Sequence, residues 1–171
     1  MATAISSRSY QIVLKGYNSN YVVERKVNGS DEKPGHIVTG VAETFPDIDL
    51  CAAGEGPLGI LLEHYRDDGL AGTVRDTPDI DTVFTDNAVA RVALIGSGMT
   101  CLTWLGGEGA TSTAAVYPGT KLVVGQVAGS VSHPTFSTTT AELGADFKSL
   151  VGVSIEYNAG GNTTSVIAVI I

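Results

Sequence analysis

The segment ARVALIGSGMTCLTWL, residues 90–105, places two apolar runs on either side of Gly-Ser-Gly and contains the chain's only tryptophan, Trp104. An apolar strand followed by Gly-x-Gly opens many dinucleotide-binding turns. That fold also needs a third glycine, a following helix and an acidic residue about 20 positions further on. Here Cys101 stands at the third glycine position, the following residues are β-branched and broken by glycines, and residues 116–120 contain no Asp or Glu. The segment therefore predicts a β region bent at its glycines and no cofactor site.

The rest of the chain has the composition of a β protein. Of its 171 residues 43% are hydrophobic and only 6% aromatic, so Val, Ile, Leu and Ala make up most of the apolar content, and 21 glycines interrupt them. β-branched residues between glycine-rich turns predict short strands. We expect an all-β fold, or a β-rich fold with one short helix at 140–150, arranged as a compact β-barrel or β-sandwich with an extended N-terminal arm. The expected strands lie within 10–14, 21–27, 36–45, 58–65, 83–105, 120–134, 151–157 and 165–171.

The expected domain organisation is a flexible N-terminal arm at 1–15 and a single β-rich domain at 16–171. Residues 1–9 are small and polar without periodicity, which is why they are assigned to the arm. Within the domain, PGHIVTG (34–40) and PGTKLVVG (118–125) resemble each other. Each reads as a Pro-Gly turn that leads into a short β run, so we expect one structural device to be used twice in one barrel or sandwich.

Charge and composition exclude several classes of partner. The net charge is −8 and the chain has only 10 Lys and Arg, which predicts no direct nucleic-acid binding. No apolar run approaches the roughly 20 residues that span a bilayer, and the N-terminus does not resemble a signal peptide. We therefore expect no membrane partner and synthesis in a cytoplasm without export. Cys51 and Cys101 stand apart from each other and from nearby histidines, which predicts two small buried residues and no metal site, and leaves a disulfide open.

No nucleophile motif is present, and the histidines form no recognisable catalytic set. There is no G-x-S-x-G sequence; the serines next to glycines are Ser97 and Ser130. His64 lies beside Glu63 and Asp67, but a surface residue at a strand end explains it better than catalysis. The other two histidines are His36 and His133.

Two pairs of alternating carboxylates remain as candidate acid sites. Alternate residues of a strand point to one face, so each pair is compatible with calcium binding or with a glycosidase acid pair. Solvated strand edges, where charge discourages unwanted pairing, explain them better. The expectation is therefore a protein that is not an enzyme and has no cofactor. The residues are Asp47, Asp49, Asp79 and Asp81.

Four segments together resemble the head decoration (capsid cement) proteins of tailed bacterial and archaeal viruses. They are EGPLGILLEHY (55–65), ARVALIGSGMTCLTWL (90–105), AVYPGTKLVVG (115–125) and LVGVSIEYNAGGNTTSVIAVII (150–171). The similarity is a pattern of turns and strands that covers about 34–171. The glycine-rich insertion at 106–113 and the long polar loop at 66–82 depart from the shorter family members.

The resemblance implies a structural virion protein on the outer capsid surface. It would stabilise the shell by linking neighbouring major capsid protein subunits, as a homotrimer, with no turnover. An extended arm adds main-chain hydrogen bonds to a partner's sheet edge, and several arms on one oligomer raise the effective concentration. The arm residues expected to bind the capsid are Ala2, Ile5, Ser7, Arg8, Tyr10, Ile12 and Leu14.

A carbohydrate-binding or adhesion module on a β-barrel or β-sandwich is the alternative. Such sites use exposed aromatic side chains, and Trp104 sits in an apolar run that favours the core or an interface. The remaining candidates are Tyr17, Tyr21, Tyr65, Tyr117 and Tyr157.

Overall fold

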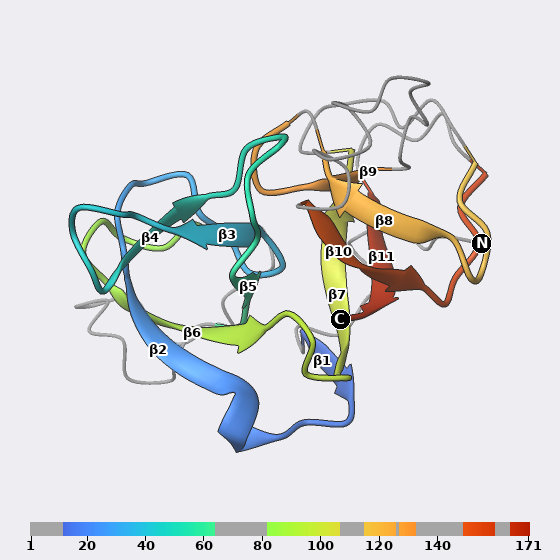
Figure 1. The fold of residues 1–171 in the computed structure, drawn as a ribbon, viewed down its shortest axis with the longest axis horizontal. Helices are drawn as coiled ribbons and strands as arrows, with labels where there is room; N and C mark the ends of the chain where they lie inside the picture. The colour runs from blue at the N-terminus through green and yellow to red at the C-terminus, as the bar shows by residue number, and fades with distance from the viewer. Residues whose placement is uncertain (1–11, 64–81, 107–114, 126, 133–148, 160–164) are drawn as a thin grey trace.

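The computed structural model describes residues 12–63, 82–106, 115–125, 127–132, 149–159 and 165–171, and these form the all-β fold that the composition predicts (Figure 1). The one helical element among the described residues is a 3-10 turn, η2 (Ser19–Tyr21). Of the helix predicted at 140–150, residues 140–148 lie outside the described residues, and Leu150 begins a strand.

The first five-stranded unit is a closed barrel. Its strands are paired in the order β2-β4-β3-β5-β6, and β6 pairs back to β2. We call it the first barrel; its strands are β2 (Val22–Val27), β3 (Ile37–Gly40), β4 (Asp47–Leu50), β5 (Gly59–Leu61) and β6 (Val89–Leu94). Alternate residues fill its interior, as the period of two along a strand requires. The interior cluster is Val27, Val38, Ile48, Leu61, Phe84, Ala90 and Val92.

The second unit is a six-stranded sheet in the order β1-β7-β11-β10-β8-β9, and an extra pairing of β9 with β7 closes five of its strands into a circuit. We call β7 to β11 the second barrel. β1 pairs with the first residues of β7, on the edge where β9 pairs with Leu105 at the other end of the strand. The strands are β1 (Val13–Lys15), β7 (Thr100–Leu105), β8 (Lys121–Val124), β9 (Val131–Ser132), β10 (Leu150–Ser154) and β11 (Ser165–Ile170).

Both barrels have the same topology. Adding five to each strand number turns every pairing of the first barrel into a pairing of the second, including the parallel pair, which is β2–β4 in one and β7–β9 in the other. The register agrees as well. Val22 pairs with Ala93 and Lys26 with Val89 across β2–β6, and Thr100 pairs with Ile170 and Trp104 with Val166 across β7–β11. The chain is therefore built from one β-barrel design used twice in succession.

The Pro-Gly device predicted from the sequence occurs once in each barrel. Gly35 and Gly119 both have positive φ, +85° and +90°, and each ends a turn that leads into β3 or β8. Gly35 N–H donates to the carbonyl of Leu61 at 2.8 Å, and Gly119 N–H donates to the carbonyl of Ser154, also at 2.8 Å. Leu61 and Ser154 occupy equivalent places in β5 and β10. The two similar sequence segments thus mark equivalent corners of two barrels, whereas the sequence predicted them within one.

A second pair of glycines marks the close crossing of two strands in each barrel. A Cβ at Gly59 of β5 would overlap the carbonyl oxygen of Ala93 in β6, and a Cβ at Gly152 of β10 would overlap that of Ile170 in β11. Only glycine permits such an approach of one backbone to another. These positions explain why LGILLE and VGVSIE occur at 58–63 and 151–156.

The barrels are joined through β7, and the core cluster around β7 also covers one face of the first barrel. The predicted continuous β region at 83–105 is divided into β6 and β7 by a turn in which Gly96 and Gly98 have φ of +86° and +74°. The bend expected there is therefore a full turn, because two residues take a conformation that other L-residues rarely adopt. All six residues of β7 are buried. Its core cluster continues into the first barrel, where it includes Ile37, Cys51, Ile60, Leu62 and Ala93.

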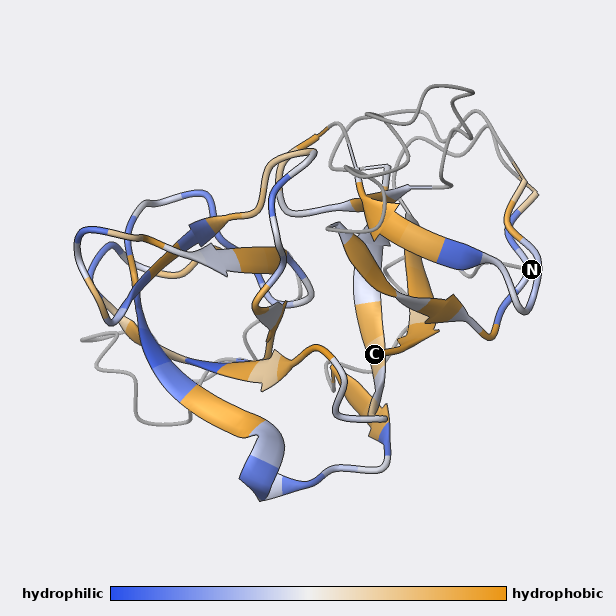
Figure 2. Cartoon of the chain, in the orientation of Figure 1, coloured by the Kyte–Doolittle hydropathy of each residue, from blue (hydrophilic) through white to orange (hydrophobic). Residues whose placement is uncertain are grey.

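Hydropathy follows this arrangement. In Figure 2 the strands that belong to the shared core, such as β11, are mostly hydrophobic, whereas β2 carries a hydrophilic stretch on the far side of the first barrel. That stretch is the Glu-Arg-Lys sequence at 24–26.

Candidate functional site

The predicted capsid-binding arm is divided by the boundary of the described structure. Ala2, Ile5, Ser7, Arg8 and Tyr10 lie outside the described residues. The other two predicted arm residues, Ile12 and Leu14, lie on the folded part of the protein. Residues 13–15 form β1, paired with β7. The last part of the predicted arm is therefore integrated in the sheet.

Ile12 anchors the N-terminal segment between the barrels. Its side chain is fully buried in the shared core. Its carbonyl oxygen accepts a hydrogen bond from Leu102 N–H of β7 at 2.8 Å, and its N–H donates to Glu63 Oε2 at 3.3 Å. Glu63 Oε1 lies 3.6 Å from a guanidinium nitrogen of Arg91 in β6. The start of β1 is thus held by the first barrel on one side and the second barrel on the other.

Leu14, two residues later, points outward. Its side chain is 44% exposed, in contrast to Ile12 and Val13. The pairing of β1 with β7 shifts register at this point, between Val13 and Lys15. Leu14 is therefore exposed to contact with another molecule, whereas Ile12 is packed into the protein's own core.

The Gly-Ser-Gly sequence lies in the turn that connects β6 to β7. Ser97 N–H donates to the carbonyl of Leu94, and Gly98 N–H donates to that of Ile171 at 2.6 Å. Ser97 Oγ accepts from Met99 N–H at 3.3 Å. A strand follows, so there is no helix N-terminus to receive a pyrophosphate.

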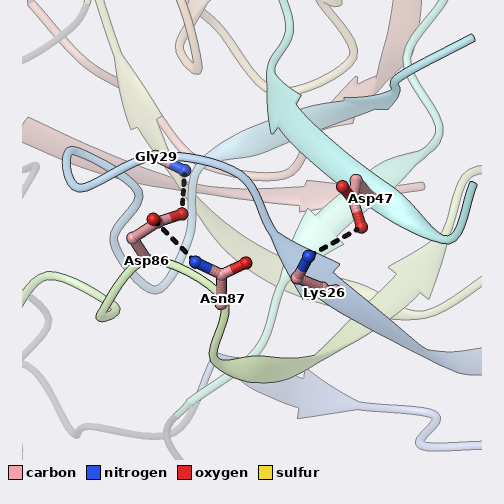
Figure 3. A network of polar contacts seen from close by, with 5 residues as sticks. All are labelled: Lys26, Gly29, Asp47, Asp86 and Asn87. Atoms are coloured by element: carbon pink, nitrogen blue, oxygen red, sulfur yellow. Dashed lines mark hydrogen bonds and ion pairs between the residues drawn. The ribbon is translucent and has the colours of Figure 1, made fainter. Parts of the chain in front are cut away.

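Asp47 and Asp49 lie on a central strand of the first barrel, which corrects the expectation of a solvated strand edge. β4 pairs with β2 on one side and β3 on the other because the barrel is closed. Asp47 is buried, and its carboxylate lies 3.7 Å from Lys26 Nζ (Figure 3). Asp49 Oδ1 accepts from the N–H of Leu50. Asp79 and Asp81 are outside the described residues.

A second polar contact in Figure 3 ties the turn after β2 to the turn before β6. Asp86 Oδ1 accepts from Gly29 N–H at 3.2 Å and its other oxygen accepts from Asn87 Nδ2 at 2.7 Å. Nearby, the pKa of Glu32 is raised above its usual value, mainly because its carboxyl is buried, and Glu32 Oε2 accepts from Asp31 N–H at 3.1 Å. These carboxylates fix turns. Among the described residues no three His, Cys, Asp or Glu side chains converge on a possible metal position.

His36 and Trp104 form part of the joint between the barrels. The His36 ring meets the Trp104 ring edge-on with centroids 5.9 Å apart, and His36 Nδ1 accepts from Lys33 N–H at 3.1 Å. Trp104 is fully buried, as its apolar surroundings predicted, and its Nε1–H donates to the carbonyl of Pro34 at 2.9 Å. Thr103 Oγ1 donates to the carbonyl of Gly35 at 2.8 Å. The first Pro-Gly turn is therefore bound to β7.

Neither of the other histidines is described, because His64 and His133 lie outside the described residues. The cysteines agree with their prediction as small buried residues. Cys51 and Cys101 are free and buried, and burial is the main reason why the pKa of each thiol is raised to about 12. Neither is a nucleophile at neutral pH, since the thiolate is the reactive form.

Two exposed tyrosines lie side by side on the second barrel. The rings of Tyr117 and Tyr157 have centroids 5.2 Å apart and planes inclined by 45°. A β-bridge between Val116 and Asn158, one residue away from each, holds the two segments together. Tyr17 and Tyr21 are also exposed, on the segment between β1 and β2, and Tyr65 is outside the described residues.

No helix in the described ranges is long and apolar enough to cross a bilayer. No protein-family model matches the chain. A comparison with curated proteins likewise finds no match.

Glu63 is the site residue that sequence reasoning missed. It was considered only as a neighbour of His64, whereas the structure makes it the partner of Ile12, 51 residues earlier in the chain. The sequence does contain a signal, because Glu63 and Glu156 close the two similar segments at 58–63 and 151–156. Glu156 Oε2 also accepts a backbone hydrogen bond, from Ala168 N–H at 3.1 Å.

Proposed function

We propose that the protein is a structural virion protein that binds the outer surface of a viral capsid and stabilises it by linking neighbouring major capsid protein subunits. In this proposal it acts as a homotrimer, catalyses no reaction, and uses the residues that precede β1 to contact the shell. The sequence resemblance to head decoration proteins motivates it. The observation that carries it is the anchor at Ile12.

The anchor suits a mechanical role. A decoration protein must transmit load from its contact with the shell into its own body. Load on the N-terminal segment passes through Ile12 to Leu102 in the second barrel and to Glu63 in the first. β1 is antiparallel to β7, the strand that is buried along its whole length. The arm is thus attached where the two barrels meet, and the buried backbone bonds there resist extraction.

Deletion of residues 1–9 tests the proposal. The truncated chain keeps Ile12 and β1, so its melting temperature should stay within a few degrees of the full chain's. Co-sedimentation with purified capsids that lack this protein should fall at least tenfold. The matched control is a full-length chain with the order of residues 2–9 scrambled, which keeps length and composition. Capsid binding of the truncated protein equal to that of the full chain would contradict the arm's role.

The Tyr117–Tyr157 pair favours a second candidate, a carbohydrate-binding or adhesion module. Exposed aromatic faces held in place by neighbouring backbone are what sugar rings stack on, and the bridge at Val116 and Asn158 fixes these two. Glycan-array binding that is lost in Tyr157→Ala and kept in Tyr21→Ala would support it. Tyr21 is a fitting control because it is 44% exposed and Tyr157 is 42% exposed. Absence of binding to every glycan would count against it.

A further inference from the structure

The repeated topology allows one face of each barrel to be compared residue by residue. On the first barrel, Ile37, Ile60 and Ala93 stand next to one another across β3, β5 and β6. Leu62 follows on the same side, after β5. All four are fully buried and belong to the core cluster that continues into the second barrel. This face of the first barrel is covered by the second barrel and β1.

The equivalent positions on the second barrel follow from the matching registers. Lys121, Val153 and Ile170 stand next to one another across β8, β10 and β11. Ile155 takes the place of Leu62: Ile155 N–H donates to the carbonyl of Ala168, as Leu62 N–H does to that of Arg91. We call Lys121, Val153, Ile155 and Ile170 the outer face of the second barrel.

The outer face is apolar at its centre and open. Ile155 is 44% exposed and Ile170 is 42% exposed, whereas their counterparts Leu62 and Ala93 are fully buried. The strands beneath are held in place by the barrel, so these side chains cannot turn inward. Exposed apolar side chains grouped on a rigid sheet mark an interaction surface.

Two lysines border this centre in a chain of net charge −8. Lys121 is directly beside Val153, and Lys15 pairs with Thr100, which pairs in turn with Ile170. Neighbouring strands are about 4.8 Å apart, so Lys15 lies within about 10 Å of Ile170. These two lysines attract an acidic surface, and the charged side chains of a second copy of this chain are mainly carboxylates.

We propose that a second copy of this chain docks on the outer face of the second barrel. The equivalent face of the first barrel is already covered within the chain, and the second barrel, which has the same topology, is what covers it. The charge at the rim suits the acidic exterior of a second copy. The proposal deepens the proposed function and rests on its assumption that the protein self-associates.

The test is the mass of the purified protein by sedimentation velocity, without capsids. Wild type should sediment as an oligomer. Ile155→Glu and Ile170→Glu, which place a carboxylate in the apolar centre, should each weaken self-association at least tenfold and shift the protein to monomer. Val89→Glu is the matched control, because Val89 is 54% exposed and lies in β6 of the first barrel. It should keep the wild-type mass.

Lys121→Glu gives an independent measurement that leaves the apolar centre intact. It should weaken association, and added salt should weaken the association of wild type in the same direction, since rim charges are screened. Circular dichroism melting curves of all variants establish that each is folded.

Several results would overturn the proposal. Wild type that is monomeric at every concentration tested would do so, and so would Ile155→Glu and Ile170→Glu proteins with unchanged mass. Monomeric wild type together with loss of capsid co-sedimentation in these two variants would assign the face to the capsid protein instead. Oligomeric wild type that does not bind capsids would leave this proposal standing and refute the proposed function.

Discussion

Buried thiols show how the environment of a single side chain sets its chemistry. The pKa of both Cys51 and Cys101 is raised to about 12, with burial as the main cause and the charges of Glu55 and Glu63 as the lesser ones. An aromatic disulfide reagent at pH 8 should leave both thiols of the native protein unmodified and modify two per chain in guanidinium chloride. Rapid modification of the native protein would contradict the burial.

The same shift makes stability depend on pH. A thiol whose pKa is higher in the folded state than in the unfolded one ionises first in the unfolded chain. The stability that the two neutral thiols contribute is complete below about pH 9 and is lost as the pH rises towards about 12. A Cys51→Ser, Cys101→Ser variant should lose less stability than wild type over this interval, as measured by urea unfolding.

Gly152 is a second position where the environment of a single residue controls stability, because there is no room for a Cβ atom. Its Cβ would overlap the backbone of Ile170, which cannot move without opening the β10–β11 pair. Gly152→Ala should lower the free energy of unfolding by about 1–3 kcal/mol or more, as overpacking does. Gly40→Ala is the control, because a Cβ at Gly40 has no atom within 4 Å and the change should be under about 1 kcal/mol. Equal effects in thermal melts would show that the crossing relaxes.

At the level of strands, the side chain of Ile12 anchors the start of β1. Ile12→Ala removes a fully buried side chain between the barrels and should cost about 2–5 kcal/mol in urea unfolding. Leu14→Ala, at a half-exposed position in β1 two residues later, should cost less than about 1 kcal/mol. If the two variants had the same stability, the segment would not be anchored as described.

Most strands were predictable from the sequence, and their arrangement was not. β-branched residues between glycines placed both ends of β2 and β11 within one residue, and those of β10 within three. β4 was misread as an exposed edge because its two aspartates are polar, and only the closed barrel buries Asp47 beside Lys26. Barrel closure depends on pairings between strands far apart in sequence, which no local pattern contains.

The candidate site was predictable to a smaller extent. The sequence does not distinguish exposed Leu14 from buried Ile12, because Ile12 is held by Glu63 and Leu102, both distant in the chain. The outer face of the second barrel has a sequence signal in the similarity of 58–63 and 151–156. The similarity alone does not reveal an interaction surface, because only the structure shows that the face formed by 58–63 is covered and the face formed by 151–156 is exposed.

The molecule as a whole should unfold as one unit, because the core cluster of the second barrel also covers one face of the first barrel, whose interior cluster is separate. Trp104, the chain's only tryptophan, lies at their joint and reports on it. Its fluorescence and the far-ultraviolet circular dichroism should therefore change at the same urea concentration. Two separated midpoints would show that the barrels unfold independently.

Trp104→Phe provides a check on the joint itself. The substitution leaves the buried carbonyl oxygen of Pro34 without its donor and should cost about 1–3 kcal/mol by circular dichroism. One transition should remain.

Because the two barrels share one topology and one register, β2 can in principle pair with β11 in place of β6 during folding, which would give a misfolded chain. The side chains discriminate between these partners. Correct pairing sets Glu24 opposite Arg91 and Leu102 opposite Ala168. Exchange would set the carboxylate opposite an alanine and the guanidinium opposite a leucine, and would forfeit the attraction of opposite charges across the strands. We therefore expect the Glu24–Arg91 position in one half and the apolar Leu102–Ala168 position in the other to disfavour swapped, aggregation-prone products.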